Sequence, residues 1–317
     1  MKRTCDFCYR LCCLSDGQKG VCGVRQNQGG RLVSLGWGNV VALASDPVEK
    51  KPLYHFLPGT HTLSFALFGC NFKCSFCQNY TISQQEYHSQ REGRPLEPRE
   101  IVDLALFHGS PTISFTYSEP LVWQDYLCEV AHLAKEAALM TIMVTNGSFS
   151  APALDRLLPL IDAFNVDLKG DESFYRRVCK ASREPVLAAI EAIVEAKRHL
   201  EVTTMVTESD HTPAVMEALS EELKTRGVEV WHLSRYVPRY RYHDRATSEE
   251  FLAEAVERAR ESGIPHVYAG NSAQDTSTYC PHCHALLIRR GALRPVSRVA
   301  GGCCPECGHR LYGHFPA

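Results

Sequence analysis

The sequence predicts an α/β fold in which parallel strands and covering helices alternate around a complete or partial barrel. Between about residues 60 and 271, short apolar runs alternate with amphipathic segments at intervals of about 30 residues. A polar or ionisable side chain follows every proposed strand, as expected where chemistry collects at the carboxyl ends of barrel strands. The chain has 317 residues, 44% apolar and 22% charged, which is enough for one large core and small appendages.

Seven runs are expected to form the strands of this sheet: residues 62–68, 112–116, 141–145, 163–167, 201–206, 229–233 and 266–269. The intervening helices are amphipathic, and a long one is expected over residues 122–138. Ser150 and Ser248 are predicted to cap the starts of two further helices. Gly227 and Gly263 follow helices in the position of C-caps.

The chain divides into three predicted regions. Residues 1–45 form a cysteine-rich metal-binding segment, which includes a short hairpin over residues 31–43. Residues 46–271 form the barrel, with a linker up to residue 59, and residues 272–317 form a zinc ribbon.

Composition and charge limit the classes of function. The formal net charge is −2, so no strong field draws the main body to nucleic acid or to a membrane. No apolar run approaches the roughly 20 residues that span a bilayer, and no secretory h-region follows Met1, so we expect a cytoplasmic protein. Fifteen cysteines in a reducing compartment favour metal sites over disulfides, and most of them fall into three groups.

The central cysteine group follows the first proposed strand. Cys70, Cys74 and Cys77 have the spacing C-x3-C-x2-C, which suits three corners of an iron–sulfur cube. The fourth iron then has no protein ligand within the loop, so it can bind a chelating amino acid and donate one electron to it. The simpler alternative is half of a zinc site completed from elsewhere.

The N-terminal group contains Cys5, Cys8, Cys12 and Cys22, with Cys13 adjacent to the third. Four thiolates from two tight turns suit a zinc knot or a second iron–sulfur cluster, and a site without metal is the third alternative. Glycines at positions 17, 20 and 23 supply the turns.

The C-terminal group consists of two C-x2-C knuckles separated by twenty residues. Its cysteines are Cys280, Cys283, Cys304 and Cys307, a ribbon spacing typical of tetrahedral zinc, and Cys303 could replace its neighbour. The segment between the knuckles is basic. Its arginines, at positions 289, 290, 294 and 298, could contact nucleic acid, dock a protein partner or be solvated.

Polar residues at the carboxyl ends of the predicted strands suggest one shared site, because these ends meet at one face of a barrel. Helix and strand caps alone would account for only some of them. The residues are Cys70, Ser118, Glu119, Asn146, Asp167, Lys169, Glu208, His232, Arg235, Tyr236 and Asn271.

Residues 69–79, with Phe76 directly before the last cysteine, resemble the cluster loop of radical S-adenosylmethionine (SAM) enzymes. Over nearly the whole chain, the match is to the radical SAM component of the AmmeMemoRadiSam system, which is related to the activating enzymes of pyruvate formate-lyase. The segments that carry this resemblance are residues 46–59, 69–79, 117–120, 167–170 and 268–271.

The resemblance implies that Cys70, Cys74 and Cys77 hold a [4Fe-4S] cluster whose open iron takes the amino and carboxylate groups of SAM. Reductive cleavage of the sulfonium would give a 5′-deoxyadenosyl radical, which abstracts hydrogen from an unidentified peptide, protein or small molecule. An external one-electron donor and protein partners from the same system are also implied.

Within such a site, Glu119 is the expected acceptor for the SAM ammonium and Lys169 the partner of its carboxylate. Asn146 can hydrogen-bond the ribose or the carboxylate. The further expected SAM-site residues are Phe76, Tyr117, Ser118, Asp167 and His232. Several of these residues also have a simpler interpretation. Glu119 could be a charge at a helix N-terminus, Lys169 a solvated loop residue and Asp167 a strand-end cap. His232 and His266 could have ordinary structural roles.

Two segments depart from the pattern of the relatives. Tyr117 and Ser118 replace two glycines of the Gly-Gly-Glu-Pro element of activases, so the backbone can approach SAM differently there. Residues 207–211 lack the expected proline-glycine-asparagine turn. The two alternative functions are a glycyl-radical-enzyme activase and a non-catalytic, zinc-dependent binding protein.

Overall fold

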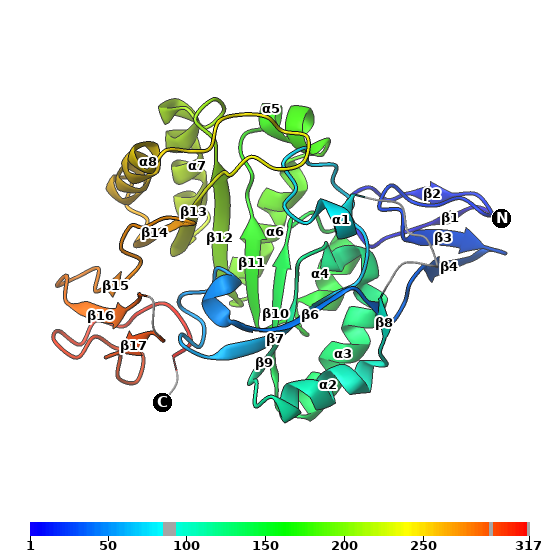
Figure 1. The fold of residues 1–317 in the computed structure, drawn as a ribbon, viewed down its shortest axis with the longest axis horizontal. Helices are drawn as coiled ribbons and strands as arrows, with labels where there is room; N and C mark the ends of the chain where they lie inside the picture. The colour runs from blue at the N-terminus through cyan, green and yellow to red at the C-terminus, as the bar shows by residue number, and fades with distance from the viewer. Residues whose placement is uncertain (85–92, 292–293, 316–317) are drawn as a thin grey trace.

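The computed structural model describes residues 1–84, 93–291 and 294–315, and its centre is an eight-stranded sheet (Figure 1). The strand order is β14-β13-β12-β11-β10-β9-β7-β6; β7 and the strands from β9 to β14 pair in parallel, while β6 is antiparallel to β7. Within the described residues the sheet is open, with β14 and β6 as its edges, so it is a partial barrel. The strands are β6 (Ala42–Pro47), β7 (His61–Ala66), β9 (Thr112–Phe115), β10 (Met140–Thr145), β11 (Ala163–Asp167), β12 (His199–Val206), β13 (Val230–Arg235) and β14 (His266–Gly270).

All seven strands predicted for the barrel are confirmed, with ends that differ by at most two residues. Each strand pairs with the barrel strand that precedes it in the chain, as helical crossovers between parallel strands require. The helices and single turns are η1 (Val48–Lys50), α1 (Tyr80–Ser83), α2 (Pro98–Phe107), η2 (Pro120–Trp123), α3 (Gln124–Glu136), α4 (Ala151–Leu157), α5 (Glu172–Phe174), the π-helical turn η3 (Tyr175–Cys179), α6 (Glu184–Glu195), α7 (Pro213–Thr225) and α8 (Glu249–Glu261).

The predicted helix caps are confirmed. The Ser150 hydroxyl accepts a hydrogen bond from the Ala153 amide at 3.1 Å, and the Ser248 hydroxyl accepts one from Phe251 at 3.2 Å. Such caps contribute about 1 kcal/mol each to stability. The long helix predicted over residues 122–138 is instead a 3₁₀ turn, η2, followed by α3.

Large aromatic side chains fill the layer between the strands β7 and β9 and the helices that cover their outer face. Phe65 and Phe115 pack edge to face with ring centroids 5.4 Å apart, and Trp123 covers them from η2. All three are at most 2% exposed, so each contributes about 2–3 kcal/mol through burial. This packing holds the strand ends, and hence the residues that follow them, in fixed positions.

The hairpin predicted over residues 31–43 is wrong. Strand β4 (Arg31–Ser34) pairs with β3 (Arg25–Gln28), whereas β6 (Ala42–Pro47) joins the edge of the main sheet. Glycines 36 and 38 both have positive φ angles, which turn the chain away from a direct hairpin return. Strand β6 therefore crosses the proposed boundary at residue 45, and the division into domains stays a prediction.

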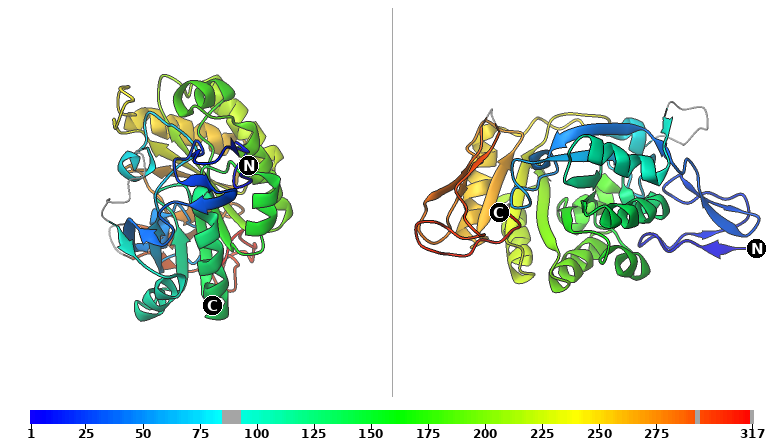
Figure 2. Two further views of the ribbon diagram at one scale, coloured as in Figure 1. Left: turned by 90° about the vertical axis from the view of Figure 1, so that its right-hand side faces the viewer. Right: turned by 90° about the horizontal axis from the view of Figure 1, so that it is seen from below.

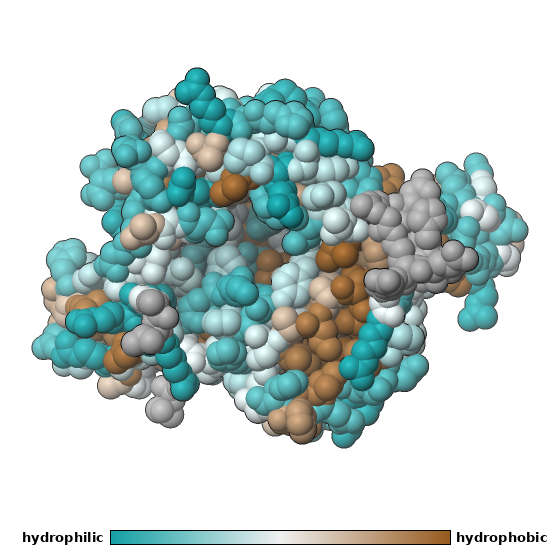
Figure 3. All heavy atoms as spheres, viewed as in Figure 1, coloured by the Kyte–Doolittle hydropathy of each residue, from teal (hydrophilic) through white to brown (hydrophobic). Residues whose placement is uncertain are grey.

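The two cysteine-rich appendages lie at opposite ends of the long axis of the molecule (Figures 1 and 2). The remaining short strands are β1 (Arg3–Thr4), β2 (Cys13–Leu14), β5 (Asn39–Val40), β8 (Arg94–Pro95), β15 (Thr278–Tyr279), β16 (Leu286–Arg289) and β17 (Val296–Ser297). Figure 3 shows a mainly hydrophilic face, with apolar residues gathered right of centre. None of the helices in the described ranges is both long enough and apolar enough to cross a bilayer.

Candidate active site

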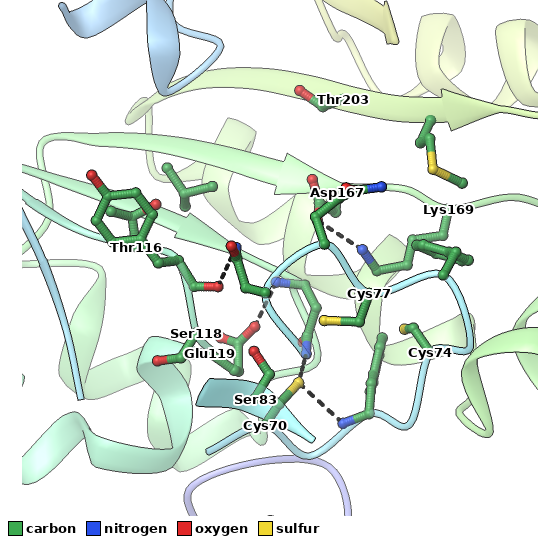
Figure 4. Close-up of a pocket in the computed structure, with 18 of the residues that line it drawn as sticks. Cys70, Cys74, Cys77, Ser83, Thr116, Ser118, Glu119, Asp167, Lys169 and Thr203 are labelled. Atoms are coloured by element: carbon green, nitrogen blue, oxygen red, sulfur yellow. Dashed lines mark hydrogen bonds and ion pairs between the residues drawn. The ribbon is translucent and has the colours of Figure 1, made fainter. Parts of the chain in front are cut away.

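A cavity of about 710 Å³ lies at the carboxyl ends of the parallel strands. The loop after β7 contributes three thiols to its lining, and the segment after β9 contributes Tyr117, Ser118 and Glu119. Figure 4 shows Cys74 and Cys77 near Lys169, with Cys70 nearer to Glu119. The cavity therefore combines thiols, a carboxylate and an ammonium group, as the sequence predicted.

The cysteine loop starts at Gly69, where φ is +110°, a conformation that side chains other than glycine rarely adopt. A Cβ at this position would lie 2.7 Å from a methyl group of Val24, so the N-terminal segment packs directly onto the loop. The Phe72 amide donates a hydrogen bond to the Cys70 sulfur at 3.4 Å, and the Asn146 side-chain amide donates to the same sulfur at 3.8 Å. Such donors stabilise a thiolate, the form that binds metal.

Burial raises the pKa of the Cys70 and Cys77 thiols. For Cys74 the main cause of a raised pKa is a hydrogen bond with the Cys179 thiol, followed by burial. A bound cation therefore has to compensate for the cost of forming these thiolates in a closed site. Cys179 ends the π-helical turn η3, a kind of distortion that is frequent at functional sites.

Glu119 is 3% exposed and has all its oxygen atoms engaged by protein donors. One oxygen accepts from the Thr145 hydroxyl at 2.6 Å, and the other accepts from the Asn146 amide at 2.8 Å. Burial raises the pKa of this carboxyl group to about 7, although those hydrogen bonds act in the opposite direction. A cation placed beside Glu119 would favour its ionised form.

The Asn146 side chain connects the strand ends to the cysteine loop. Its amide donates to the Asn71 side-chain oxygen at 2.8 Å, and its own oxygen accepts from the Ser148 hydroxyl at 2.6 Å. The Asn71 amide donates to the same Ser148 hydroxyl at 2.8 Å. This closed network orients Asn146 and leaves it at the wall of the cavity.

Lys169 lies deep in the cavity opposite Glu119. Its Nζ atom is 2.7 Å from the Asp167 carboxylate and 5.7 Å from the centroid of the Phe76 ring. Burial lowers the pKa of Lys169, but Asp167 and the thiols of Cys74 and Cys179 outweigh it, so the net pKa is raised. The site thus holds a charged ammonium that can bind an anion.

Tyr117 adopts a positive φ of 64°, which is rare for a large residue. Its hydroxyl donates a hydrogen bond to Asp46, and that carboxylate also pairs with Lys51 at 2.8 Å. The Lys51 ammonium lies 4.4 Å from the centroid of the Tyr117 ring. The strained backbone is therefore held by two contacts of the Tyr117 side chain, one with Asp46 and one with Lys51.

Several residues predicted at the strand ends lie outside the cavity lining. His232 is in the middle of β13, where its ring lies 2.6 Å from the buried carboxylate of Glu201. It is one layer below Ser234, which does line the cavity, so the placement of His232 at the SAM site is not supported. Glu208 caps α8 through the Ser248 amide and hydroxyl.

Tyr236, a member of the predicted ring, and His266, for which a structural role was one of the alternatives, are both packing residues. Tyr236 is buried and donates its hydroxyl to the carbonyl of Tyr242 at 2.7 Å. His266 is at the opposite end of the barrel, with its ring 4.3 Å from that of His55. Arg235 and Asn271 line the cavity as predicted.

Sequence reasoning missed several residues of the cavity lining, four of which carry the clearest lesson. Lys50, at the end of η1, and Lys51, directly after it, line the cavity, and Thr203 and Met205 line it from β12. The alternation of β12, which places residues 203 and 205 on one face, could have indicated the latter pair. The lysines depend on how the segment before β7 folds back, for which the local sequence has no periodic signal.

The four C-terminal thiols converge as a group. Their sulfur atoms all lie within 4.8 Å of one another, and Cys280 and Cys307 are separated by 3.7 Å, as are Cys283 and Cys304. Cys303 is adjacent but belongs to a turn with Ala300. Of the two adjacent residues Cys303 and Cys304, Cys304 is therefore the one whose thiol faces the centre of the four-thiol group.

The basic ribbon uses most of its arginines in internal contacts. Arg290 donates to the Tyr54 carbonyl at 2.6 Å, and Arg294 donates to the Gly59 carbonyl at 2.8 Å. Arg298 pairs with Glu306 at 2.6 Å. These contacts favour docking onto the barrel over contact with nucleic acid.

Sequence comparisons identify relatives of the chain. A family model described as the radical SAM superfamily matches residues 66–219. An uncharacterised protein of Methanocaldococcus jannaschii is 39% identical over 298 residues, covering 91% of this chain and 88% of that protein. A second protein of this organism, named as a candidate glycyl-radical enzyme activating enzyme, is 22% identical over 65% of this chain and 78% of its own length.

Solved structures with the same fold include radical SAM proteins. A radical SAM methyltransferase from Sphaerobacter thermophilus has a TM-score of 0.54 at 19% identity, and the match covers 68% of each chain. SuiB of Streptococcus suis has a TM-score of 0.52 at 14% identity, covering 65% of this chain and 48% of SuiB. This chain therefore spans about half the length of SuiB, and the likeness establishes the fold.

Proposed function

The chain belongs to the radical SAM superfamily, and from this premise we propose that it cleaves SAM reductively on a [4Fe-4S] cluster in order to remove hydrogen from a substrate. One observation carries the proposal. Three cysteines with C-x3-C-x2-C spacing share a cavity of about 710 Å³ with the buried carboxylate of Glu119 and the partly buried ammonium of Lys169. The proposed substrate is a peptide, a protein or a small molecule.

The residues of the cavity fit both groups. Cys70, Cys74 and Cys77 would each ligate one iron, and the fourth iron would remain free for SAM. Glu119 would accept hydrogen bonds from the SAM amino group, and Lys169 would pair with its carboxylate. When bound, the reduced cluster supplies one electron that splits the sulfonium into methionine and a 5′-deoxyadenosyl radical, which takes hydrogen from the substrate.

The protein groups around this position restrict what else can react. The Phe76 ring stacks on Phe174 with centroids 5.8 Å apart, which shields one side of the loop from water. Tyr117 is held by Asp46 and Lys51 at another side. A site for radical chemistry has to exclude solvent and stray hydrogen donors, and these packed side chains contribute to that exclusion.

The part of the cavity beyond the SAM groups is left for substrate. Lys50, with a side chain 70% exposed, and Arg235, 26% exposed, lie at its margin. Asn271 adds a hydrogen-bonding group at the end of β14. These residues suit a substrate that carries an anionic or carbonyl group, such as a peptide backbone with acidic side chains.

We further propose that Cys280, Cys283, Cys304 and Cys307 bind zinc. Four thiolates about 2.3 Å from a tetrahedral zinc ion are separated by about 3.8 Å, and the two closest sulfur pairs here are 3.7 Å apart. The ribbon contacts the amino ends of the strands, so its metal would stabilise the fold and take no part in the reaction. Zinc counting after removal of loosely bound metal tests this assignment.

On the sequence resemblance, we propose that the chain is the radical SAM component of the AmmeMemoRadiSam system. Residues 46–59, which carry much of that resemblance, contain the Asp46–Lys51 pair at the cavity wall, so a specific segment of the family pattern contributes to the site. Such an enzyme requires an external one-electron donor. Co-purification with the other proteins of the system, with or without dithionite, tests the proposed partners.

The central experiment is anaerobic reconstitution of the full chain with iron and sulfide. We expect a broad visible charge-transfer band that bleaches with dithionite, and release of 5′-deoxyadenosine from SAM. Intact cluster content without 5′-deoxyadenosine would contradict the proposal, and a protein that binds only zinc would support the non-catalytic alternative.

A residue-level experiment tests the role of Glu119. Glu119→Gln should lower 5′-deoxyadenosine formation at least about 10-fold, because a hydrogen bond to a charged group contributes about 1.5–3 kcal/mol. Its iron content should remain unchanged. Glu136→Gln, on the exposed end of α3, is the matched control and should behave as the wild type.

A further inference from the structure

The four N-terminal thiols surround a small cavity behind the active-site loop. Cys5, Cys8, Cys12 and Cys22 all line it. Backbone contacts hold two of their segments together, since the Cys5 amide donates to the Cys12 carbonyl at 2.9 Å. The Leu11 amide donates to the Cys8 carbonyl at 3.1 Å, which closes the intervening turn. Cys13 is exposed, so the adjacent thiol is not part of this set.

The spacing of these thiols differs from that of the C-terminal set. Among the residues that the structure describes, only the C-terminal cysteines form a group of three or more ligand atoms within 4.8 Å of one another. By this measure the N-terminal thiols are more widely spaced, as a set, than the four C-terminal thiols. A cubane distributes its thiolates over four different irons, so its sulfur ligands lie farther apart than those of one tetrahedral ion.

Gly20 leaves the space between two of these sulfurs free. A Cβ built at this position would lie 3.7 Å from the Cys12 sulfur and also 3.7 Å from the Cys22 sulfur. A larger side chain would therefore extend into the region between the thiols.

Two arginines line the same cavity, and the guanidinium of one of them, Arg25, also pairs with the Asp125 carboxylate at 2.8 Å. Arg10 and Arg25 both line it, and within the described chain neither Nε atom has a hydrogen-bond partner. Arg25 is 6% exposed, so its unpaired N–H group is costly unless a ligand accepts from it. A cluster with four thiolates and a 2+ core carries a net charge of −2, and its sulfur atoms can accept such hydrogen bonds.

The cavity is separated from the active site by the thickness of one loop. Asn71 lines the N-terminal cavity, whereas Cys70 and Phe72 on either side of it line the active-site cavity. Cys8 also forms a backbone bridge with Phe149, which follows the Asn146 turn. A redox group in the N-terminal cavity would therefore lie within short electron-transfer range of the cysteine loop.

We propose that Cys5, Cys8, Cys12 and Cys22 hold a second iron–sulfur cluster, a [4Fe-4S] cube whose irons are all ligated by protein. Such a cube has no iron free for substrate, so its chemistry is the transfer of single electrons. It gains one electron from an external low-potential donor, of the reduced ferredoxin or flavodoxin class, and gives up the same electron toward the loop of Cys70. The transfer of this electron to the loop of Cys70 rests on the proposed function, whereas the assignment of a cluster to the four N-terminal cysteines does not.

The decisive experiment removes the first cluster and asks what remains. In the full chain, Cys70, Cys74 and Cys77 are together replaced by serine, and the protein is reconstituted anaerobically. We expect about four irons and about four sulfides per chain, since one cube remains. After dithionite reduction, its paramagnetic resonance signal should not change on addition of SAM, because no iron is open. A triple variant that holds zinc but no iron would overturn the proposal.

A reciprocal experiment uses the wild-type loop. Cys8→Ser combined with Cys22→Ser should lower iron from about eight to about four per chain, and the remaining signal should respond to SAM. Cys13→Ser, an exposed neighbour, should retain about eight irons, since two cubes remain. If wild-type protein holds about four irons that all depend on Cys70, Cys74 and Cys77, the second cluster is absent although the proposed function survives.

Discussion

The N-terminal and C-terminal cysteine quartets begin with the same C-x2-C spacing but occupy opposite ends of the molecule (Figure 2). The N-terminal quartet packs behind the cysteine loop, where Val24 fills the space above Gly69. The C-terminal quartet belongs to a ribbon that covers the amino ends of the strands, where the Tyr312 hydroxyl accepts from the Leu200 amide at 2.7 Å. A motif of this kind therefore predicts a metal site, and its place in the barrel limits what a metal bound there could do.

The end of the barrel at the ribbon is organised around a buried carboxylate. Glu201 accepts hydrogen bonds from the backbone amides of Tyr54 and His55 at 2.9 and 2.7 Å. The side chains of His199 and His232 approach it at 2.9 and 2.6 Å. At the active-site end of the barrel, polar groups face a large cavity. At the ribbon end, the polar groups around Glu201 hydrogen-bond one another, which is characteristic of a structural network.

The largest expected effect is that of removing two of the thiols proposed to bind zinc at the C-terminal end. Cys280→Ser with Cys304→Ser should abolish zinc binding and unfold the ribbon, because structural zinc contributes on the order of 10 kcal/mol to small metal-stabilised folds. Zinc content and protease sensitivity of residues beyond Asn271 measure the effect. Reconstituted iron should remain at the wild-type level. Loss of iron together with zinc would mean that the two ends of the barrel are not independent.

A smaller effect is expected from the buried carboxylate itself. Glu201→Gln keeps the size of the side chain but removes the charge that pairs with His199 and His232, which should cost about 3–5 kcal/mol of unfolding free energy. Urea unfolding measures it. Glu217→Gln, an exposed position in α7, is the matched control and should change stability by less than about 0.5 kcal/mol.

The same region predicts a pH dependence of stability. Burial lowers the pKa of His266 to about 4, so the folded protein keeps this ring neutral at pH values where the unfolded chain binds a proton. The contribution of His266 to stability should be constant above about pH 6.5 and fall by up to about 3 kcal/mol as the pH decreases toward 4. Burial also lowers the pKa of His55, whose ring packs against it, and this adds to the same trend.

His266→Gln tests this origin, since it removes a group that protonates on unfolding. The slope of unfolding free energy against pH between 4 and 6.5 should become shallower, whatever the change in absolute stability. His108→Gln, at an exposed position after α2, should leave the slope unchanged. Equal slopes in wild type and His266→Gln would assign the acid sensitivity to other groups.

The sequence predicted the parts of this molecule that depend on local periodicity. The seven barrel strands, the capping roles of Ser150 and Ser248 and the convergence of Glu119 with the cysteine loop all follow from patterns within short segments. The depth of a residue within the barrel does not follow from such local patterns. His232 and Ser234 lie on the same face of β13, and only the packing of Glu201 below them places one in the core and the other at the cavity.

The pairing of strands that lie far apart in the sequence also could not be predicted from local sequence patterns. Residues 42–47 join β7 as an edge strand, although the sequence before them suggested a hairpin. The distinction between the two cysteine quartets is of the same kind. Both have C-x2-C knuckles, and only the three-dimensional spacing separates a set that suits one ion from a set that surrounds a cavity.

The smallest expected effect probes the contact between the N-terminal segment and the cysteine loop. Gly69→Ala should destabilise the protein by about 2–3 kcal/mol, because φ is +110° and the new Cβ would lie 2.7 Å from Val24. Gly109→Ala is a close control, since φ there is +61° but nothing lies within 4 Å of the new atom. It should cost only about 1 kcal/mol through the backbone conformation.

The difference between the two glycine variants isolates the contact with Val24. Combining Gly69→Ala with Val24→Ala should recover part of the lost stability, because the shorter side chain makes room for the added methyl group. Unfolding free energies of the four proteins in this cycle measure the coupling. If Gly69→Ala and Gly109→Ala cost the same, the N-terminal segment does not press on the loop in solution, and the physical connection between the N-terminal quartet and the active site is lost.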